Sequence, residues 1–174
     1  MQPTPSVYGQ NAWPTNVNKA LLLVRCLIGL LFVGHASQKL FGLFGGEGIG
    51  AFVGTMEKIG AQPAPFWAYF AATAELVGGA LLVLGLLTPL AAALLVGEMA
   101  VAVFEVHWPK GLWGQQGGFE YPLVLAVVVA AIGLTGPGVY SLDNRLPLAL
   151  PKPWTFLAAA AVGLAVVFFF VIRP

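Results

Sequence analysis

The stretch that decides the fold class reads ALLLVRCLIGLLFVGHASQKLF, at residues 20–41. It is long enough to cross a bilayer, because a transmembrane helix needs about 20 mostly apolar residues. Four further stretches share its character, at residues 66–87, 89–108, 121–137 and 154–172. Open sheets leave backbone groups unsatisfied in lipid, and the alternating polarity of a β-barrel is missing, so all five stretches predict α-helices.

The composition of the whole chain agrees with a membrane protein. Of its 174 residues, 59% are hydrophobic and 9% are charged, whereas a soluble domain has roughly 25% charged residues. The formal net charge of +1 favours neither nucleic acid nor a strongly acidic partner. We therefore expect an all-α protein in the lipid bilayer, with a four-helix transmembrane bundle, one additional C-terminal transmembrane helix and no nucleic-acid partner.

Composition divides the chain into four parts. Residues 1–18 are polar and contain prolines, so they should form an arm outside the membrane, and residues 19–143 should form the four-helix bundle. Residues 144–153 form a proline-bearing linker. Residues 154–174 carry the fifth transmembrane helix, which has no polar site residue and should either face lipid or dock to another subunit.

Two long connections, at residues 42–65 and 108–120, should lie on the same side of the membrane. In the first, Phe52, Met56 and Ile59 recur at helical spacing, which predicts a short helix lying on the membrane surface. Under the positive-inside rule, the lysines and arginines place the N-terminal face in the cytoplasm by a small margin. We therefore expect a multi-pass protein of a bacterial or archaeal cytoplasmic (inner) membrane, with both connections outside.

Ionisable side chains within the apolar stretches are the best guide to function. A charge near the bilayer centre costs about 2.5–3.5 kcal/mol even on lenient insertion scales, unless the group faces a partner, a cavity or a ligand. Seven polar residues from four predicted helices should lie in the same half of the membrane, opposite the N-terminal face. They are His35, Gln38, Lys39, Glu75, Glu105, His107 and Glu120. Glu98 lies near the middle of its span, on the same predicted helix face as Glu105.

Structural roles compete with functional ones for several of these residues. Lys39 could extend its ammonium group to the headgroups, and His107 could simply belong to the interface. Arg25, in the first span, should either extend to the N-terminal face or form a structural ion pair with Glu98.

Seven short motifs follow one another along the chain. In order they are Arg25-x3-Gly29-x2-Phe32-x2-His35-x2-Gln38-Lys39-Leu40-Phe41-Gly42, Gly54-x-Met56-Glu57-x2-Gly60, Glu75-x2-Gly78-Gly79, Gly85-Leu86-Leu87-Thr88-Pro89, Met99-x2-Ala102-x4-His107, Gly117-Gly118-x-Glu120-Tyr121 and Gly136-Pro137-Gly138-x-Tyr140-Ser141-x-Asp143. Together they resemble the DoxX family of small membrane proteins, over about residues 20–143. The resemblance implies a four-helix membrane bundle. The family takes its name from a small subunit of a thiosulfate:quinone oxidoreductase, which passes electrons from thiosulfate to membrane quinone.

The resemblance and the polar groups together suggest a quinone-linked oxidoreductase or its quinone-binding subunit. His35 and Glu75 have the weakest structural explanations, since neither reaches water easily, and they would donate protons to the two quinone oxygens. The catalytic residues expected on this interpretation are His35, Glu75 and Glu105. The residues expected to bind the quinone, or a small anion such as thiosulfate, are Gln38, Lys39, Glu98, His107 and Glu120.

Three alternatives stay open. Imidazole and carboxylate groups suit several divalent ions, so the histidines and glutamates could hold a metal ion. The sequence has no cysteine pair, no CxxCH motif and no flavin-binding domain, which favours a non-catalytic accessory subunit of a larger respiratory or photosynthetic membrane complex. A transporter of small solutes or lipids would also use a polar cavity, but the chain shows no inverted repeat.

Overall fold

The computed structural model describes residues 13–146 and 153–168. Most of the expected arm, most of the linker and the end of the fifth span therefore lie outside the described residues. The described part contains no strand, which confirms the all-α prediction. Its α-helices are α1 (Thr15–Phe41), α2 (Gly48–Lys58), α3 (Ala64–Leu84), α4 (Thr88–Val101), α5 (Glu120–Thr135) and α6 (Trp154–Val167).

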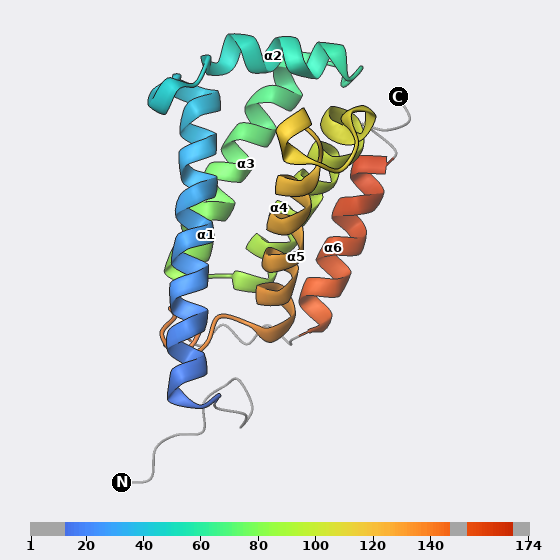
Figure 1. The fold of residues 1–174 in the computed structure, drawn as a ribbon. Coiled ribbons are helices and arrows are strands. Elements are labelled where there is room, and N and C mark those ends of the chain that lie inside the picture. The colour runs from blue at the N-terminus through green and yellow to red at the C-terminus, as the bar shows by residue number, and fades with distance from the viewer. Residues whose placement is uncertain (1–12, 147–152, 169–174) are drawn as a thin grey trace, which may run out of the picture.

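Five of these helices run side by side, and α2 lies across one end of them (Figure 1). Three are long and apolar enough to cross a membrane, namely α1, α3 and the run from Thr88 to Lys110 that begins with α4. Helix α5 has 16 residues and so rises about 24 Å. The described part of α6 has 14 residues.

Helix α1 begins earlier than the sequence predicted, inside the segment expected to form the arm. Its first residue is Thr15, directly after Pro14. The side-chain amide of Asn18 donates to the carbonyl oxygens of Trp13, at 2.5 Å, and Pro14, at 3.3 Å. These contacts satisfy carbonyl groups at the start of the helix, so the polar residues there belong to the helix.

Helix α2 is the predicted surface helix. It caps the end of the bundle and packs against the start of α3 (Figure 1). Met56 is buried there with Ala61, Ala64 and Ala68. The packing brings α2 beside the last turn of α1, where the sequence predicts polar site residues.

The backbones of α1 and α3 approach closely at two glycines. A Cβ atom added to Gly79 would lie 2.8 Å from the carbonyl oxygen of Gly29, and one added to Gly29 would lie 2.7 Å from that of Gly79. Small residues at such crossings allow transmembrane helices to pack tightly. The close contact between α1 and α3 fixes how the side chains of the two helices face each other.

Gly79→Ala should therefore destabilise the bundle by about 1–3 kcal/mol, the usual cost of overpacking a dense interior. Gly34→Ala, also in this helix pair, is the matched control, because an added Cβ there meets nothing within 4 Å. Thermal unfolding in detergent should give a lower midpoint for Gly79→Ala and an unchanged or slightly higher one for Gly34→Ala. Equal midpoints would contradict the close crossing.

Helices α3 and α4 form a tight hairpin, as the single residue between the apolar stretches at 66–87 and 89–108 implies. Gly85 and Leu87 turn the chain with φ angles of 62° and 49°. The buried carboxylate of Asp143 accepts hydrogen bonds from the backbone N–H groups of Leu87, at 2.7 Å, and Thr88, at 2.9 Å. The first N–H groups of a helix lack intrahelical partners, so a distant residue caps α4.

The predicted ion pair between Arg25 and Glu98 is wrong. The guanidinium of Arg25 is buried and donates hydrogen bonds to the carbonyl oxygens of Pro137 and, at 2.6 Å, Tyr140. The alternative prediction was that Arg25 extends toward the N-terminal face, and it does. Its guanidinium, however, binds backbone carbonyl groups there instead of water. It ties α1 to the segment that follows α5.

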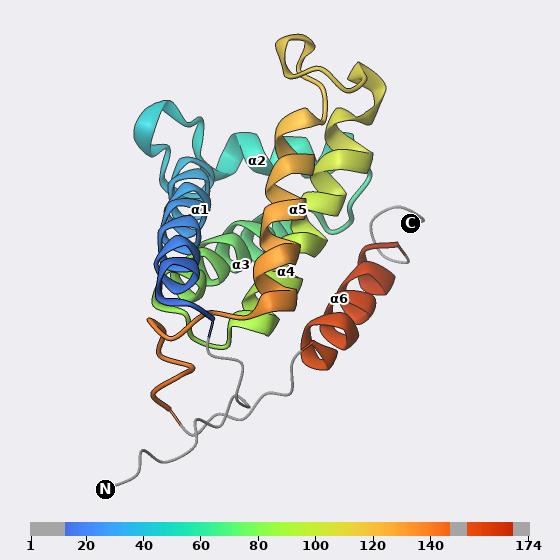
Figure 2. The ribbon, with the colours of Figure 1, turned by 60° about the horizontal axis from the view of Figure 1, so that its bottom comes forward.

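Helix α6 docks on its own chain. It packs against α4 and α5, on the side of the bundle away from α1 (Figure 2). At the contact with α5, a Cβ added to Gly133 would lie 2.3 Å from the Phe156 ring. One face of α6 is therefore used within the chain.

Candidate functional site

A buried ion pair between Lys39 and Glu75 forms the centre of the site. Lys39 comes from the last turn of α1 and Glu75 from the middle of α3. Glu75 is 1% exposed, whereas the Lys39 side chain keeps 31% of its surface. The Lys39 ammonium also lies 4.9 Å from the centre of the Phe52 ring of α2. The Lys39 ammonium therefore contacts both a buried carboxylate and the face of an aromatic ring.

A second carboxyl group, Glu98, approaches this pair from α4. Its Oε1 atom is buried and has no hydrogen-bond partner among the described residues. The charged groups that act on Glu98 are Glu75 and Lys39. A buried polar atom without a partner is costly, so this oxygen is available to a ligand or a water molecule.

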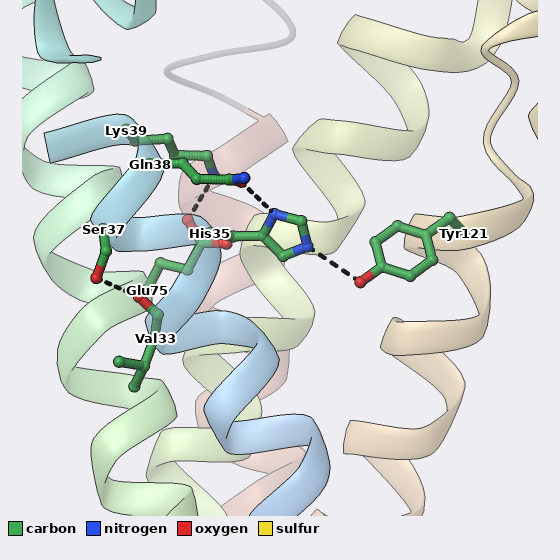
Figure 3. Close-up of polar contacts among 7 residues, drawn as sticks. All are labelled: Val33, His35, Ser37, Gln38, Lys39, Glu75 and Tyr121. Carbon is green, nitrogen blue, oxygen red and sulfur yellow. Dashed lines mark hydrogen bonds and ion pairs between the residues drawn. The ribbon is translucent and has the colours of Figure 1, made fainter. Parts of the chain in front are cut away.

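His35 links α1 to α5 through two hydrogen bonds. Its Nδ1 atom lies 3.1 Å from Gln38 Oε1, and its Nε2 atom lies 3.0 Å from the hydroxyl of Tyr121. Figure 3 shows the imidazole ring between these two side chains, with Glu75 and Lys39 on the side away from Tyr121. The charge of Glu75 also acts on Tyr121, so the His35 contacts adjoin the ion pair.

Tyr121 is the residue that sequence reasoning missed. The sequence predicted it only as part of a motif with Gly117, Gly118 and Glu120, with no role of its own. The signal that could have found it is its position beside Glu120, at the start of a helix and at the membrane depth predicted for His35. The structure thus brings together five predicted residues and one new one, which are His35, Gln38, Lys39, Glu75, Glu98 and Tyr121.

Two other predicted residues hold the loop that follows α4. His107 pairs through Nδ1 with the carbonyl oxygen of Gly117 at 2.7 Å, and the exposed Glu120 accepts from the N–H of Gly114 at 2.8 Å. Within the described part of the chain, neither makes a hydrogen bond or ion pair with Glu75. Their observed contacts order the loop.

The prediction that Glu105 and Glu98 share one helix face assumes a continuous α-helix between them. The chain passes into a π-helical segment, Ala102–His107, directly after α4. A π-helix has more residues per turn than an α-helix, so the α-helical turn count does not apply to Glu105. Glu105 makes no hydrogen bond or ion pair with any residue that the structure describes.

A small open cavity adjoins Lys39, between the end of α1 and α2. Its volume is about 130 Å³. The residues that line it are Gln38, Lys39, Glu47, Gly48, Ala51, Phe52 and Thr55. Lys39 therefore contacts both the buried carboxylate and a space open to the outside of the bundle.

The described residues do not form a metal site. No three side chains of histidine, cysteine, aspartate or glutamate among them lie close enough to hold a metal ion together. The Glu75 carboxylate already has Lys39 as its partner.

Comparison with known proteins agrees with the bundle. The chain is 30% identical over 149 residues to the uncharacterized membrane protein Rv3486 of Mycobacterium tuberculosis, covering 78% of this chain and 88% of that protein. It is 31% identical over 123 residues to a Bacillus subtilis protein named "Putative oxidoreductase CatD", covering 70% of this chain and 83% of that protein. No solved structure matches the chain significantly. The DoxX family profile matches residues 20–108, and the protein belongs to the DoxX family.

Proposed function

We propose that the protein is a membrane subunit of a quinone-linked oxidoreductase, in which Lys39, Glu75 and Glu98 form an intramembrane site that holds and moves protons. The observation that carries the proposal is the buried Lys39–Glu75 pair beside the unpartnered carboxyl oxygen of Glu98. Ionisable groups in membrane-spanning helices are costly and mark functional sites by default. Membership of the DoxX family and similarity to the relative named "Putative oxidoreductase CatD" support the same class of function.

The residues of the site offer the hydrogen-bonding groups that a quinone headgroup needs. When bound, a quinone would supply the redox chemistry, and its two oxygens gain protons on reduction. A protonated Glu98 carboxyl could donate a hydrogen bond to a quinone oxygen, since its Oε1 atom has no partner among the described residues. Glu75 holds the Lys39 ammonium in place, and Lys39, which stays partly exposed, links the buried carboxyls to the cavity.

A small anion such as thiosulfate is the proposed reductant. Organic ligands usually occupy pockets of roughly 300–1,000 Å³, whereas the cavity beside Lys39 has a volume of about 130 Å³. That size suits a small ion, and Lys39 offers it a positive charge. We further propose that partner membrane subunits carry the electrons, and that the cavity faces the outside of a cytoplasmic membrane.

Extraction of quinone from the purified protein tests this function. The protein, isolated from native membranes in mild detergent, should carry bound quinone. Glu98→Gln should lower the bound amount at least tenfold, which corresponds to about 1.4 kcal/mol of binding free energy. Glu57→Gln, an exposed glutamate of α2, is the matched control and should keep the quinone.

Native mass spectrometry of the same samples distinguishes this function from the main alternative, an accessory subunit without a quinone site. If the wild-type protein carries no quinone but arrives attached to larger redox subunits, the proposed quinone site is wrong. The protein is then an accessory subunit whose polar cluster serves only to hold the bundle together.

A further inference from the structure

Gln38 sets the direction of the hydrogen bonds that pass through His35. The amide Nε2 of Gln38 donates to the carbonyl oxygen of Phe44 at 3.2 Å, and a carbonyl oxygen can only accept. The other end of the amide, Oε1, therefore faces His35 Nδ1 at 3.1 Å. Because Oε1 also can only accept, Nδ1 carries the proton of the imidazole.

The same logic fixes the role of Tyr121. A neutral imidazole with its proton on Nδ1 has a free electron pair on Nε2. Nε2 therefore accepts the hydrogen bond of 3.0 Å from the Tyr121 hydroxyl. The phenol has one proton, and that proton points at His35. For any other molecule, the Tyr121 oxygen is left as an acceptor alone.

Tyr121 is also the most exposed member of the site. It is 47% exposed, on the first turn of the apolar helix α5, whereas Glu75 is fully enclosed. The side chain of Tyr121 is therefore open to a molecule that approaches the cluster beside α5.

We infer that Tyr121 and His35 form a proton relay at the lipid-facing edge of the site, and that the relay recognises the reduced, hydroxyl-bearing form of a quinone. The inference rests on the proposed function and adds Tyr121 to its residues. A quinol hydroxyl can donate to the Tyr121 oxygen, whereas a quinone carbonyl can only accept and finds no donor there. The hydrogen-bond direction thus favours the reduced form of the ligand.

In the direction of quinone reduction, the relay delivers one proton in two linked transfers. The Tyr121 O–H bond breaks as an O–H bond forms on the anion of the reduced ligand, while the Nε2–H bond of a His35 imidazolium breaks and a new O–H bond forms on Tyr121. The imidazolium becomes a neutral imidazole and the ligand anion becomes its neutral hydroxyl form, so charge and atoms balance. Tyr121 ends with its new proton directed at His35, which is the observed arrangement.

Nitrogen NMR tests the hydrogen-bond direction without any ligand. The chain has two histidines, so ¹⁵N-histidine labelling in lipid nanodiscs gives few signals, and His107→Gln assigns them. We expect His35 to be protonated on Nδ1 and unprotonated on Nε2. Tyr121→Phe should shift the Nε2 signal, and Tyr69→Phe, which removes an exposed hydroxyl from α3, should leave it unchanged. A proton on His35 Nε2 in the wild type overturns the relay.

Binding of a decyl-benzoquinol and its oxidised benzoquinone to the same nanodiscs tests the recognition. The wild type and Tyr69→Phe should bind the quinol at least tenfold more tightly than the quinone. Tyr121→Phe should lose that preference. Equal affinities in the wild type, with both ligands still sensitive to Glu98→Gln, overturn the relay and leave the proposed function standing. Binding of neither ligand overturns both.

Discussion

Lys39→Met should lower the free energy of unfolding by about 3 kcal/mol. Removing one partner of a buried ion pair usually costs about 3–5 kcal/mol, because the other charge is left buried without compensation. Glu75 is 1% exposed and has no second cationic partner among the described residues. The low end of the range applies because the Lys39 side chain keeps 31% of its surface, so solvent screens part of the interaction.

Thermal unfolding in detergent measures this effect. For a chain of this size, about 3 kcal/mol corresponds to a fall in the midpoint of about 6–12 °C. The double variant Lys39→Met/Glu75→Gln should regain a large part of the loss, since it removes the buried charge as well. Lys58→Met, at an exposed position of α2, is the control and should change little. A double variant no more stable than Lys39→Met would contradict a buried charge pair.

Asp143→Ala should destabilise the protein by a similar amount, about 2–4 kcal/mol. Its carboxylate accepts hydrogen bonds from the backbone N–H groups of Leu87 and Thr88 at the start of α4. The first bond is partly buried and the second is buried. Each buried donor left without an acceptor costs about 1–3 kcal/mol. The backbone N–H of residue 143 also donates to the Gly85 carbonyl at 2.8 Å. Alanine keeps this bond, so the loss of stability reports the carboxylate alone.

A graded series makes the capping role of Asp143 testable. Asp143→Asn keeps one acceptor oxygen and should lose roughly half as much stability as Asp143→Ala. Asn144→Ala removes only a long hydrogen bond of 3.4 Å to the Val139 carbonyl and should change the unfolding midpoint little. If Asp143→Asn and Asp143→Ala were both as stable as the wild type, the carboxylate would not cap α4.

Hydrophobic patterning predicted most of the fold, for a physical reason. Lipid offers no hydrogen bonds to the backbone, so long apolar stretches have few choices other than helices. The surface helix α2 and the tight α3–α4 hairpin followed from helical spacing and from the short connection between two spans. The start of α1 at Thr15 did not, because polar residues at a helix end carry no hydrophobic signal.

Depth along the helices predicted part of the site. It placed Lys39 and Glu75 in the same half of the membrane, and the structure pairs them. For Glu105 the turn count assumed a continuous α-helix, and the π-helical segment breaks the count. Depth placed Arg25 toward the N-terminal face, but it did not identify its partners, which are backbone carbonyls after α5. The spacing of residues in the sequence reveals neither a π-helical segment nor a hydrogen bond to a distant backbone carbonyl.

Photolabelling with an azido-benzoquinone tests the central claim most directly. The protein would be reconstituted in vesicles, illuminated with the probe and mapped by mass spectrometry, with excess unlabelled quinone as competitor. The account predicts competed labels near Lys39 on α1, Glu98 on α4 and Tyr121 on α5. Labels spread over the lipid-facing surface of all helices, or labels that unlabelled quinone does not displace, would contradict a quinone site in this cluster.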